Sequence, residues 1–317
     1  MRPSLDVAGS TVQAVSQAVL VAVGWGAVSG AVGATTPCAC ALCDLESRAA
    51  WRLAPHRSFV RPVRCGSRDQ PAQAWVQQGG LRNDYCGLYC GPVIRLVLFD
   101  IDGTLIRTGG AGREAFAQVA ATQFQVPDGV ANLEFAGRTD RAIVREFFLR
   151  HQIEPSPANF QRFFDAYVFW LDYLLARRPG GVLPGVRESI DALQRLAHHP
   201  IVGLLTGNIR LGAEIKLRHF GLWDYFTVGG FGDDHEDRGE IARLVQQRGS
   251  QQAGRRLRGD EILVVGDTPL DIACARVIHA KSLAVATGTF SLQELQQSNP
   301  TWAVENLAAV DLAALCV

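Results

Sequence analysis

An apolar run that ends in two carboxylates constrains this chain more than any other feature. Residues 96–105 read Leu-Val-Leu-Phe-Asp-Ile-Asp-Gly-Thr-Leu. Side chains two positions apart on a strand point the same way, so Asp100 and Asp102 are expected to converge just past the end of a buried strand. Two like charges this close shift each other's pKa unless a cation lies beside them. The pair therefore predicts a divalent metal site.

The chain around this pair alternates between short apolar runs and amphipathic stretches. Near-continuous apolar strands separated by helices are typical of a parallel sheet covered on both faces. We therefore expect an α/β fold with a Rossmann-like parallel sheet core. The expected strands are 94–99, 201–205, 226–229, 262–266 and 283–287, and the expected helices between the later ones are 186–198, 211–220, 240–247 and 270–277.

Polar residues follow three of these strands. The Asp100 pair follows the first, Thr206-Gly207-Asn208 follows the second, and Gly266-Asp267 follows the fourth. Ligands of open parallel sheets bind at the carboxyl ends of the strands. Three polar clusters at three strand ends predict a single site.

One block interrupts the alternation. Residues 112–179 show helical patterns throughout, at 113–122, 139–151 and 157–178. We expect an α-helical cap domain inserted between core segments 93–111 and 180–317. The last helix carries an aromatic stripe at helical spacing, which is more typical of a helix core than of a ligand pocket. The stripe consists of Phe160, Phe163, Phe164, Tyr167, Trp170, Leu171 and Leu174.

Residues 1–92 have a different composition and no sustained period, and we interpret them as a poorly structured leader outside the folded domain. A targeting leader is one alternative, and an upstream stretch included by the choice of Met1 is another. Positions 14–34 are interrupted by Gly, Ser and Gln and make a poor membrane span. Weak metal-like spacing leaves zinc binding as a minor alternative for six cysteines there: Cys38, Cys40, Cys43, Cys65, Cys86 and Cys90.

Overall charge excludes some partners. Lys and Arg number 31, Asp and Glu number 31, and the formal net charge is +0. No electrostatic attraction to nucleic acid or to an anionic membrane is expected. Cys274 and Cys316 are typical of buried thiols in a reducing compartment, so we expect a cytoplasmic protein. The oligomeric state is left open.

The three strand-end motifs together resemble the haloacid-dehalogenase-superfamily phosphatases with a helical cap, and most of all the phosphoglycolate-phosphatase-like members. The resemblance covers roughly the last 225 residues, in the family's order of motifs. It implies a phosphoric monoester hydrolase that uses Mg²⁺. It also implies that Asp100 attacks phosphorus to form an aspartyl-phosphate, and that Asp102 acts as general acid and then general base.

The same resemblance assigns the remaining site residues. Thr206 and Gly207 would hold the phosphate at a helix N-terminus, where Asn208 either joins them or caps the helix. Asp267 would bind Mg²⁺ with Asp100 and the main-chain carbonyl of Asp102. Asp271 lies one helical turn further on, and we expect it to orient a metal-bound water rather than to bind the metal directly.

The basic residue that the family pairs with the nucleophile is not in its usual context here. No Lys-Pro follows the strand near Phe226, and Arg238 takes that approximate position. Lys216 is the other candidate, about two turns into its helix and roughly 13 Å from the phosphate end. We expect its side chain to fall short, which favours Arg238 as the phosphate-binding residue.

Other activities within the superfamily remain as alternatives. A dehalogenase does not need Asp102 or Asp267, and a phosphonate hydrolase needs a cap lysine that residues 93–215 lack. A sugar-phosphate mutase and a catalytically silent scaffold stay open.

The expected partner is a small phosphorylated metabolite such as phosphoglycolate, which a closing cap would cover completely. Arg138 and Arg141, at the start of a cap helix, either face the site and bind a substrate carboxylate or form a solvated turn. Gly109, Gly110 and Gly112 are candidate hinge residues for closure of the cap.

Overall fold

The computed structural model describes residues 92–317. The predicted leader, its six cysteines and the question of the start site lie outside the described residues. Among residues 92–317, no helix combines the length and the apolar character that a membrane crossing requires.

A six-stranded parallel sheet forms the core, in the order β5-β4-β1-β6-β7-β8. The first strand of the described residues, β1, is therefore central, with β4 and β6 as its hydrogen-bonded neighbours. The expected α/β class with a Rossmann-like core is confirmed. The strands are β1 (Leu96–Phe99), β4 (Ile201–Leu205), β5 (Val228–Gly230), β6 (Ile262–Gly266), β7 (Lys281–Val285) and β8 (Trp302–Val304).

Alternating side chains of the central strand divide the core into two layers. Val97 and Phe99 pack on one face with α4 (Val186–Arg195) and α5 (Arg210–His219). Leu96 and Leu98 pack on the other face with α6 (Arg238–Gln252) and α7 (Pro269–Val277). Both layers are buried, which explains why β1 reads as a continuous apolar run rather than an alternating one. The short α8 (Leu292–Gln297) packs against β7 at the edge.

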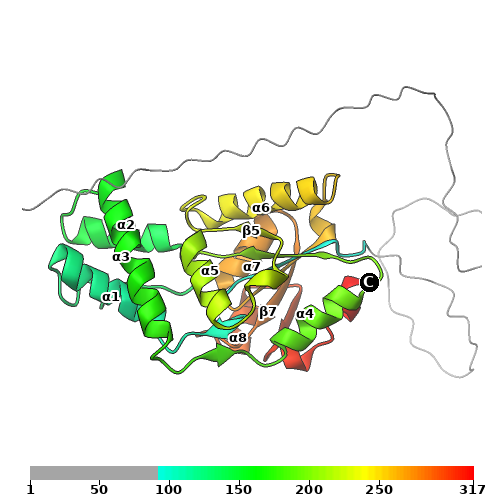
Figure 1. Cartoon of the computed structure of the whole chain (residues 1–317). Helices are drawn as coiled ribbons and strands as arrows, with labels where there is room; N and C mark the ends of the chain where they lie inside the picture. Colours follow the sequence, from blue (N-terminus) through cyan, green and yellow to red (C-terminus); the bar gives the residue numbers. More distant parts are fainter. Residues whose placement is uncertain (1–91) are drawn as a thin grey trace, which may run out of the picture. The chain divides into compact units, whose positions relative to one another are not determined.

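Three helices form a separate layer beside the sheet: α1 (Ala111–Phe124), α2 (Asp140–Arg150) and α3 (Pro157–Leu175). Figure 1 shows them as a group to the left of the strands. The predicted aromatic stripe forms their shared core, in which Phe116 meets Phe163 and Tyr167 edge to face. Thr139 caps α2, and Ser156 with Pro157 begins α3, as their side chains favour.

A short antiparallel ribbon connects the helices to the core. It pairs β2 (Ile106–Arg107) with β3 (Gly181–Val182), so the chain leaves and re-enters the core at neighbouring points. Neither this ribbon nor β8 is predicted from the sequence, because segments of two or three residues carry no readable period. The cap boundaries at residues 112 and 179 stay a prediction. The expected helix over 157–178 ends three residues earlier, at Leu175.

Candidate active site

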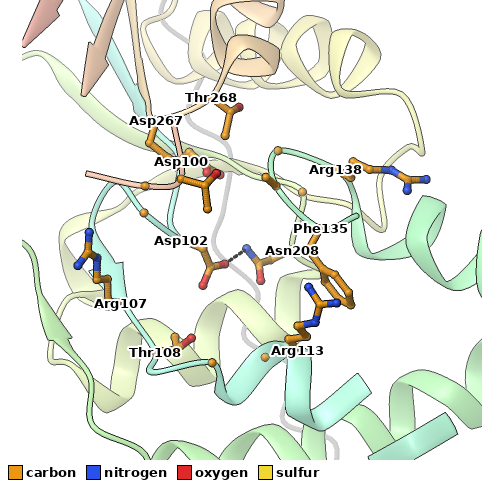
Figure 2. Close-up of a pocket in the computed structure, with 18 of the residues that line it drawn as sticks. Asp100, Asp102, Arg107, Thr108, Arg113, Phe135, Arg138, Asn208, Asp267 and Thr268 are labelled. Carbon is orange, nitrogen blue, oxygen red and sulfur yellow. Dashed lines mark hydrogen bonds between the residues drawn. The ribbon is translucent and has the colours of Figure 1, made fainter. Parts of the chain in front are cut away.

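The carboxyl ends of β1, β4 and β6 bring the three predicted clusters together. Asp100 follows β1, Thr206 follows β4 and Asp267 follows β6, and these strands are adjacent in the sheet. The clusters open onto a cavity of about 950 Å³ that also reaches the helical layer. Figure 2 shows Asp100, Asp102 and Asp267 on one side of this pocket, with Asn208 beside Asp102.

Three buried carboxylates form the innermost part of the pocket. Asp100, Asp267 and Asp271 each place an oxygen within 4.8 Å of the others. Burial raises the pKa of Asp100 to about 7, although the nearby Arg238 guanidinium opposes the shift. Burial also raises the pKa of Asp267 to about 8, and the Asp271 and Asp100 carboxylates add to that rise. A set of close carboxylate oxygens that resist ionisation fits a hard divalent cation such as Mg²⁺, which would neutralise their repulsion.

Two glycines allow the chain to close around Asp267. Gly103 has φ +85°, and a Cβ on it would lie 2.4 Å from Asp267 Oδ2. A Cβ on Gly288 would lie 1.6 Å from the same oxygen. Only glycine fits at such distances, so the turn after Asp102 and the loop after β7 both depend on it. Thr104 completes the surroundings by donating a hydrogen bond of 3.2 Å to Asp267 Oδ1.

Asp271 uses both of its oxygens within the protein. Oδ2 accepts hydrogen bonds from the Thr268 backbone N–H at 3.0 Å and from the Thr268 hydroxyl at 2.6 Å, in a capping box at the start of α7. Oδ1 pairs with Arg238. A carboxylate held in this way is better suited to orienting the surroundings of a metal than to binding it, because its lone pairs are already engaged. The predicted role of Asp271 in orienting a metal-bound water stays a prediction.

Arg238 lies beside the nucleophile candidate. Its Nη2 is 3.3 Å from Asp100 Oδ1 and also pairs with Asp271, and all three side chains are buried. Burial by itself would lower the pKa of Arg238, but Asp271 and Asp100 raise it above its ordinary value. Its Nε is the one buried side-chain nitrogen or oxygen of the described residues without a hydrogen-bond partner. The structure thus brings the favoured basic residue to Asp100.

Lys216 also reaches the pocket, and the expectation that it would fall short is wrong. Its Nζ donates 2.6 Å hydrogen bonds to Asp102 Oδ2 and to Asn208 Oδ1. The physical reason is the direction of helical side chains, which point back toward the helix N-terminus and shorten the distance to be covered. Lys216 pairs with the outer carboxylate, Asp102, whereas Arg238 pairs with the inner one, Asp100.

Asn208 connects the turn after β4 to Asp102. Its Nδ2 donates to Asp102 Oδ2 at 2.8 Å and to the Thr206 hydroxyl at 2.9 Å. It does not cap α5, whose N-cap is Ile209 without a side-chain hydrogen bond. Of the two interpretations left open for Asn208, capping is therefore wrong. Thr206 is fully buried beneath it.

The loop before α2 packs directly on the turn after β4. The Asp140 backbone N–H donates to Gly207 O at 2.8 Å, and the Asp140 carboxylate accepts from the Ile209 backbone N–H at 2.9 Å. A Cβ on Gly207 would lie 2.2 Å from Arg138 O, so glycine is required for this approach. The helical layer therefore touches the predicted phosphate cradle.

The two predicted substrate arginines are engaged elsewhere. The Arg138 guanidinium pairs with Glu146 at 2.5 Å and points away from the carboxylates, as Figure 2 shows, although the residue lines the cavity. Arg141 does not line the cavity; it pairs with Glu236 at 3.1 Å, on the loop before α6. The interpretation of Arg141 as a residue facing the site is wrong, because Glu236 holds it at the junction of α2 and the core.

Three further residues line the pocket outside the acidic group, and we call them the cap-side wall: Arg107 from β2, Arg113 from α1 and Phe135. In Figure 2, Arg107 lies on one side of Asp102, and Arg113 and Phe135 lie on the other. Neither Arg107 nor Arg113 pairs with a carboxylate among residues 92–317. Arg107 donates to Thr287 O at 2.6 Å, and Arg113 lies 5.0 Å over the Phe135 ring. Neither arginine is predicted from the sequence as a site residue, although both lie close to the candidate hinge glycines.

Comparison with protein families identifies the class to which this arrangement belongs. Residues 97–276 match the family model of haloacid dehalogenase-like hydrolases, and residues 243–310 match a second, HAD-hydrolase-like model. The chain belongs to the haloacid dehalogenase-like hydrolase family. This membership confirms the resemblance inferred from the three motifs.

Individual proteins similar to this chain include phosphatases and other hydrolases. The chain is 24% identical to the phosphoglycolate phosphatase of Agrobacterium fabrum over 222 residues, which cover 69% of this chain and 91% of that protein. CbbY from Rhodobacter sphaeroides, solved in complex with phosphate, shares the fold at a TM-score of 0.53 and 18% identity, covering 68% of this chain and 95% of that chain. A hydrolase from Pseudomonas syringae also matches at a TM-score of 0.53 and 18% identity, covering 68% of this chain and 94% of its own. The expected enzyme class, a phosphoric monoester hydrolase of the phosphoglycolate-phosphatase-like kind, is confirmed.

Proposed function

We propose that the chain is a Mg²⁺-dependent phosphatase that hydrolyses a small phosphorylated metabolite through an aspartyl-phosphate on Asp100. The observation that carries this proposal is the buried group of Asp100, Asp267 and Asp271, flanked by Arg238, at adjacent strand ends. Phosphoryl transfer needs a nucleophile in line with the leaving group and positive charge around the phosphoryl oxygens. The group offers both.

Asp100 and Asp267 would hold Mg²⁺, together with the main-chain carbonyl of Asp102. The bound cation would supply positive charge that stabilises the transferring phosphoryl group and keeps Asp100 ionised. Asp271 would keep Arg238 in place and orient water at the metal. The Arg238 guanidinium, beside Asp100, would bind a phosphoryl oxygen as a planar donor.

Asp102 would donate a proton to the leaving oxygen and later accept one from the attacking water. Its side chain is 41% exposed toward the cavity, so it can meet both. Gly207 and Asn208 form the turn beside it, and their backbone N–H groups are candidates for the phosphate cradle. The Thr206 hydroxyl would support this turn through Asn208.

The cap-side wall supports a substrate with a second anionic group. Arg107 and Arg113 bring two positive charges to the pocket, and no carboxylate of the described residues neutralises them. A phosphate ester that also carries a carboxylate, as phosphoglycolate does, would satisfy the phosphoryl site and this wall together. The buried free thiols Cys274 and Cys316 support the proposed cytoplasmic location.

Hydrolysis of a panel of phosphorylated metabolites and of 4-nitrophenyl phosphate, with and without Mg²⁺, tests the proposal. We expect release of inorganic phosphate that requires Mg²⁺ and that Asp100→Asn lowers by at least about a thousandfold. Asp172→Asn, on the exposed face of α3, is the matched control and should retain full activity. Equal phosphate release by the wild-type and Asp100→Asn proteins would refute the proposal, and isomerised product without free phosphate would indicate a mutase.

A further inference from the structure

Lys216 is a second buried cation of the pocket, in addition to Arg238. It is one of only two lysines in the chain, and it is buried, with 4% of its surface exposed. An ammonium group taken out of water is stable only when its donors are matched by acceptors. Its two hydrogen bonds, both of 2.6 Å, end on Asp102 Oδ2 and Asn208 Oδ1.

These three side chains form a closed triangle. Asn208 Nδ2 donates to the same Asp102 Oδ2 that accepts from Lys216, so this oxygen has two donors. No hydrogen bond of the described residues reaches Asp102 Oδ1, and Asp102 lines the cavity. One oxygen is therefore anchored, and the other is left for a reacting group. We call this triangle the Asp102 clamp.

The clamp lies under the helical layer. A Cβ on Gly112, in the first turn of α1, would be 3.6 Å from Lys216 Nζ, so that turn passes directly over the ammonium. Asn208 is held by its hydrogen bond to the Thr206 hydroxyl, and its neighbours Gly207 and Ile209 form hydrogen bonds with Asp140 through their backbone atoms. The donors of the clamp are thus held from α5, from the turn after β4 and from the first residue of α2.

From this geometry we propose that Lys216 is a positioning residue that holds the Asp102 carboxyl for proton transfer to the leaving oxygen, rather than a ligand of the phosphate. This inference rests on the proposed function of Asp102. Arg238 already occupies the position next to Asp100, where a phosphate ligand is needed. The Lys216 donors point instead to the carboxyl group that would handle the proton of the leaving group.

The dependence of kcat/KM on the leaving group distinguishes a residue that positions the proton donor from a residue that binds the phosphate. A positioned proton donor matters most for a poor leaving group and least for a good one, whereas a phosphate ligand affects all phosphate esters alike. The probes are substituted phenyl phosphates, from 4-nitrophenyl phosphate to unsubstituted phenyl phosphate. Their kcat/KM covers binding and phosphorylation but not the later hydrolysis of the aspartyl-phosphate, and the test does not depend on the identity of the natural substrate.

We expect Lys216→Met to lower kcat/KM for phenyl phosphate by about a hundredfold and for 4-nitrophenyl phosphate by less than about fivefold, so that rate depends more steeply on the leaving group. Inhibition by inorganic phosphate should be unchanged. Lys216→Gln keeps an amide group as donor, so its kcat/KM for phenyl phosphate should lie between those of the wild type and Lys216→Met. This variant decides the question if Lys216→Met does not fold. The matched control is Lys281→Met, which removes the other lysine, outside the cavity lining.

An equal loss across the series, or no loss at all, would overturn the role of Lys216. A larger inhibition constant for inorganic phosphate in Lys216→Met would show a phosphate ligand and would also overturn it. Failure of the proposed function gives a different result: the wild-type protein would then hydrolyse none of the phenyl phosphates with Mg²⁺.

Discussion

The two walls of the pocket differ in the charged groups that they present. The inner wall contains Asp100, Asp267 and Arg238, and the cap-side wall contains Arg107, Arg113 and Phe135. The inner wall gathers three buried carboxyl groups around one buried arginine, so its acidic groups outnumber its basic ones. The cap-side wall presents arginines with no acidic partner among residues 92–317. The comparison indicates that the inner wall is built for a cation and for reaction chemistry, whereas the cap-side wall is built for an anionic part of the substrate.

Removing a carboxylate from the inner wall should have the largest effect. Asp267→Asn takes away one proposed Mg²⁺ ligand, and we expect kcat to fall by about a hundredfold or more, with a weaker response to Mg²⁺. Steady-state kinetics over a titration of Mg²⁺ measure both. The exposed Asp172→Asn variant controls for the loss of a charge. Unchanged Mg²⁺ dependence would mean that Asp267 is not part of a metal site.

The acidity of the inner wall predicts how stability changes with pH when metal is absent. Burial raises the folded-state pKa of Asp100 to about 7 and of Asp267 to about 8, above the ordinary value of 3.8 in both cases. Each group therefore favours the folded state while it is protonated, and that contribution is lost as the pH rises from about 4 to about 8. In the presence of EDTA, we expect Tm to decrease by several degrees between pH 5.5 and pH 8.5.

Mg²⁺ should reverse this loss, because it binds the ionised carboxylates and stabilises the folded state. The increase in Tm on adding Mg²⁺ should thus be larger at pH 8.5 than at pH 5.5, and Asp267→Asn should reduce the difference. Differential scanning calorimetry measures these values. A metal-free Tm that rises steadily over this range would contradict the account of the inner wall.

The sequence predicts the inner wall well but not the cap-side wall. The Asp100, Thr206 and Asp267 clusters each follow a buried apolar strand, and the parallel sheet brings the carboxyl ends of such strands together by topology alone. No side-chain direction enters this prediction. The α/β fold with its parallel sheet is confirmed, and the structure brings Asp100 and Asp267 close together.

The cap-side wall could not be predicted in the same way, since it depends on tertiary packing. Arg113 and Arg141 both lie in or beside the first two turns of cap helices, and nothing in their spacing tells which one faces the pocket. Glu236, far away in the sequence, decides it by holding Arg141 at the core. The expectation for Lys216 is wrong for a related reason: its side chain points back toward the start of α5, so the axial distance overstates the gap to the pocket.

A change in the cap-side wall should affect recognition without affecting chemistry. For Arg113→Ala we expect KM to rise about tenfold for a phosphate ester that carries a carboxylate, with little change in kcat. Kinetics with 4-nitrophenyl phosphate, which has no second anion, serve as the internal control and should change by less than about twofold. An equal change for both substrates would place Arg113 outside substrate recognition.

The smallest effect is expected at the junction of α2 and the core, outside both walls. Arg141→Ala breaks a partly exposed pair with Glu236, while Arg145 still contacts the same carboxylate. We expect the free energy of unfolding to fall by about 0.2–1 kcal/mol and the activity to stay within about twofold. Urea unfolding and steady-state kinetics check this. A tenfold rise in KM would restore Arg141 as a substrate residue.

The central claim, that a metal-supported Asp100 accepts the phosphoryl group, is tested most directly by trapping the phosphorylated enzyme. The protein is mixed with substrate and Mg²⁺, quenched in acid and digested, and the peptides are analysed by mass spectrometry. The account predicts phosphate on Asp100, absent when EDTA replaces Mg²⁺ and absent in Asp100→Asn. Steady turnover with no phosphorylated peptide, or with the phosphate on a different residue, would contradict it.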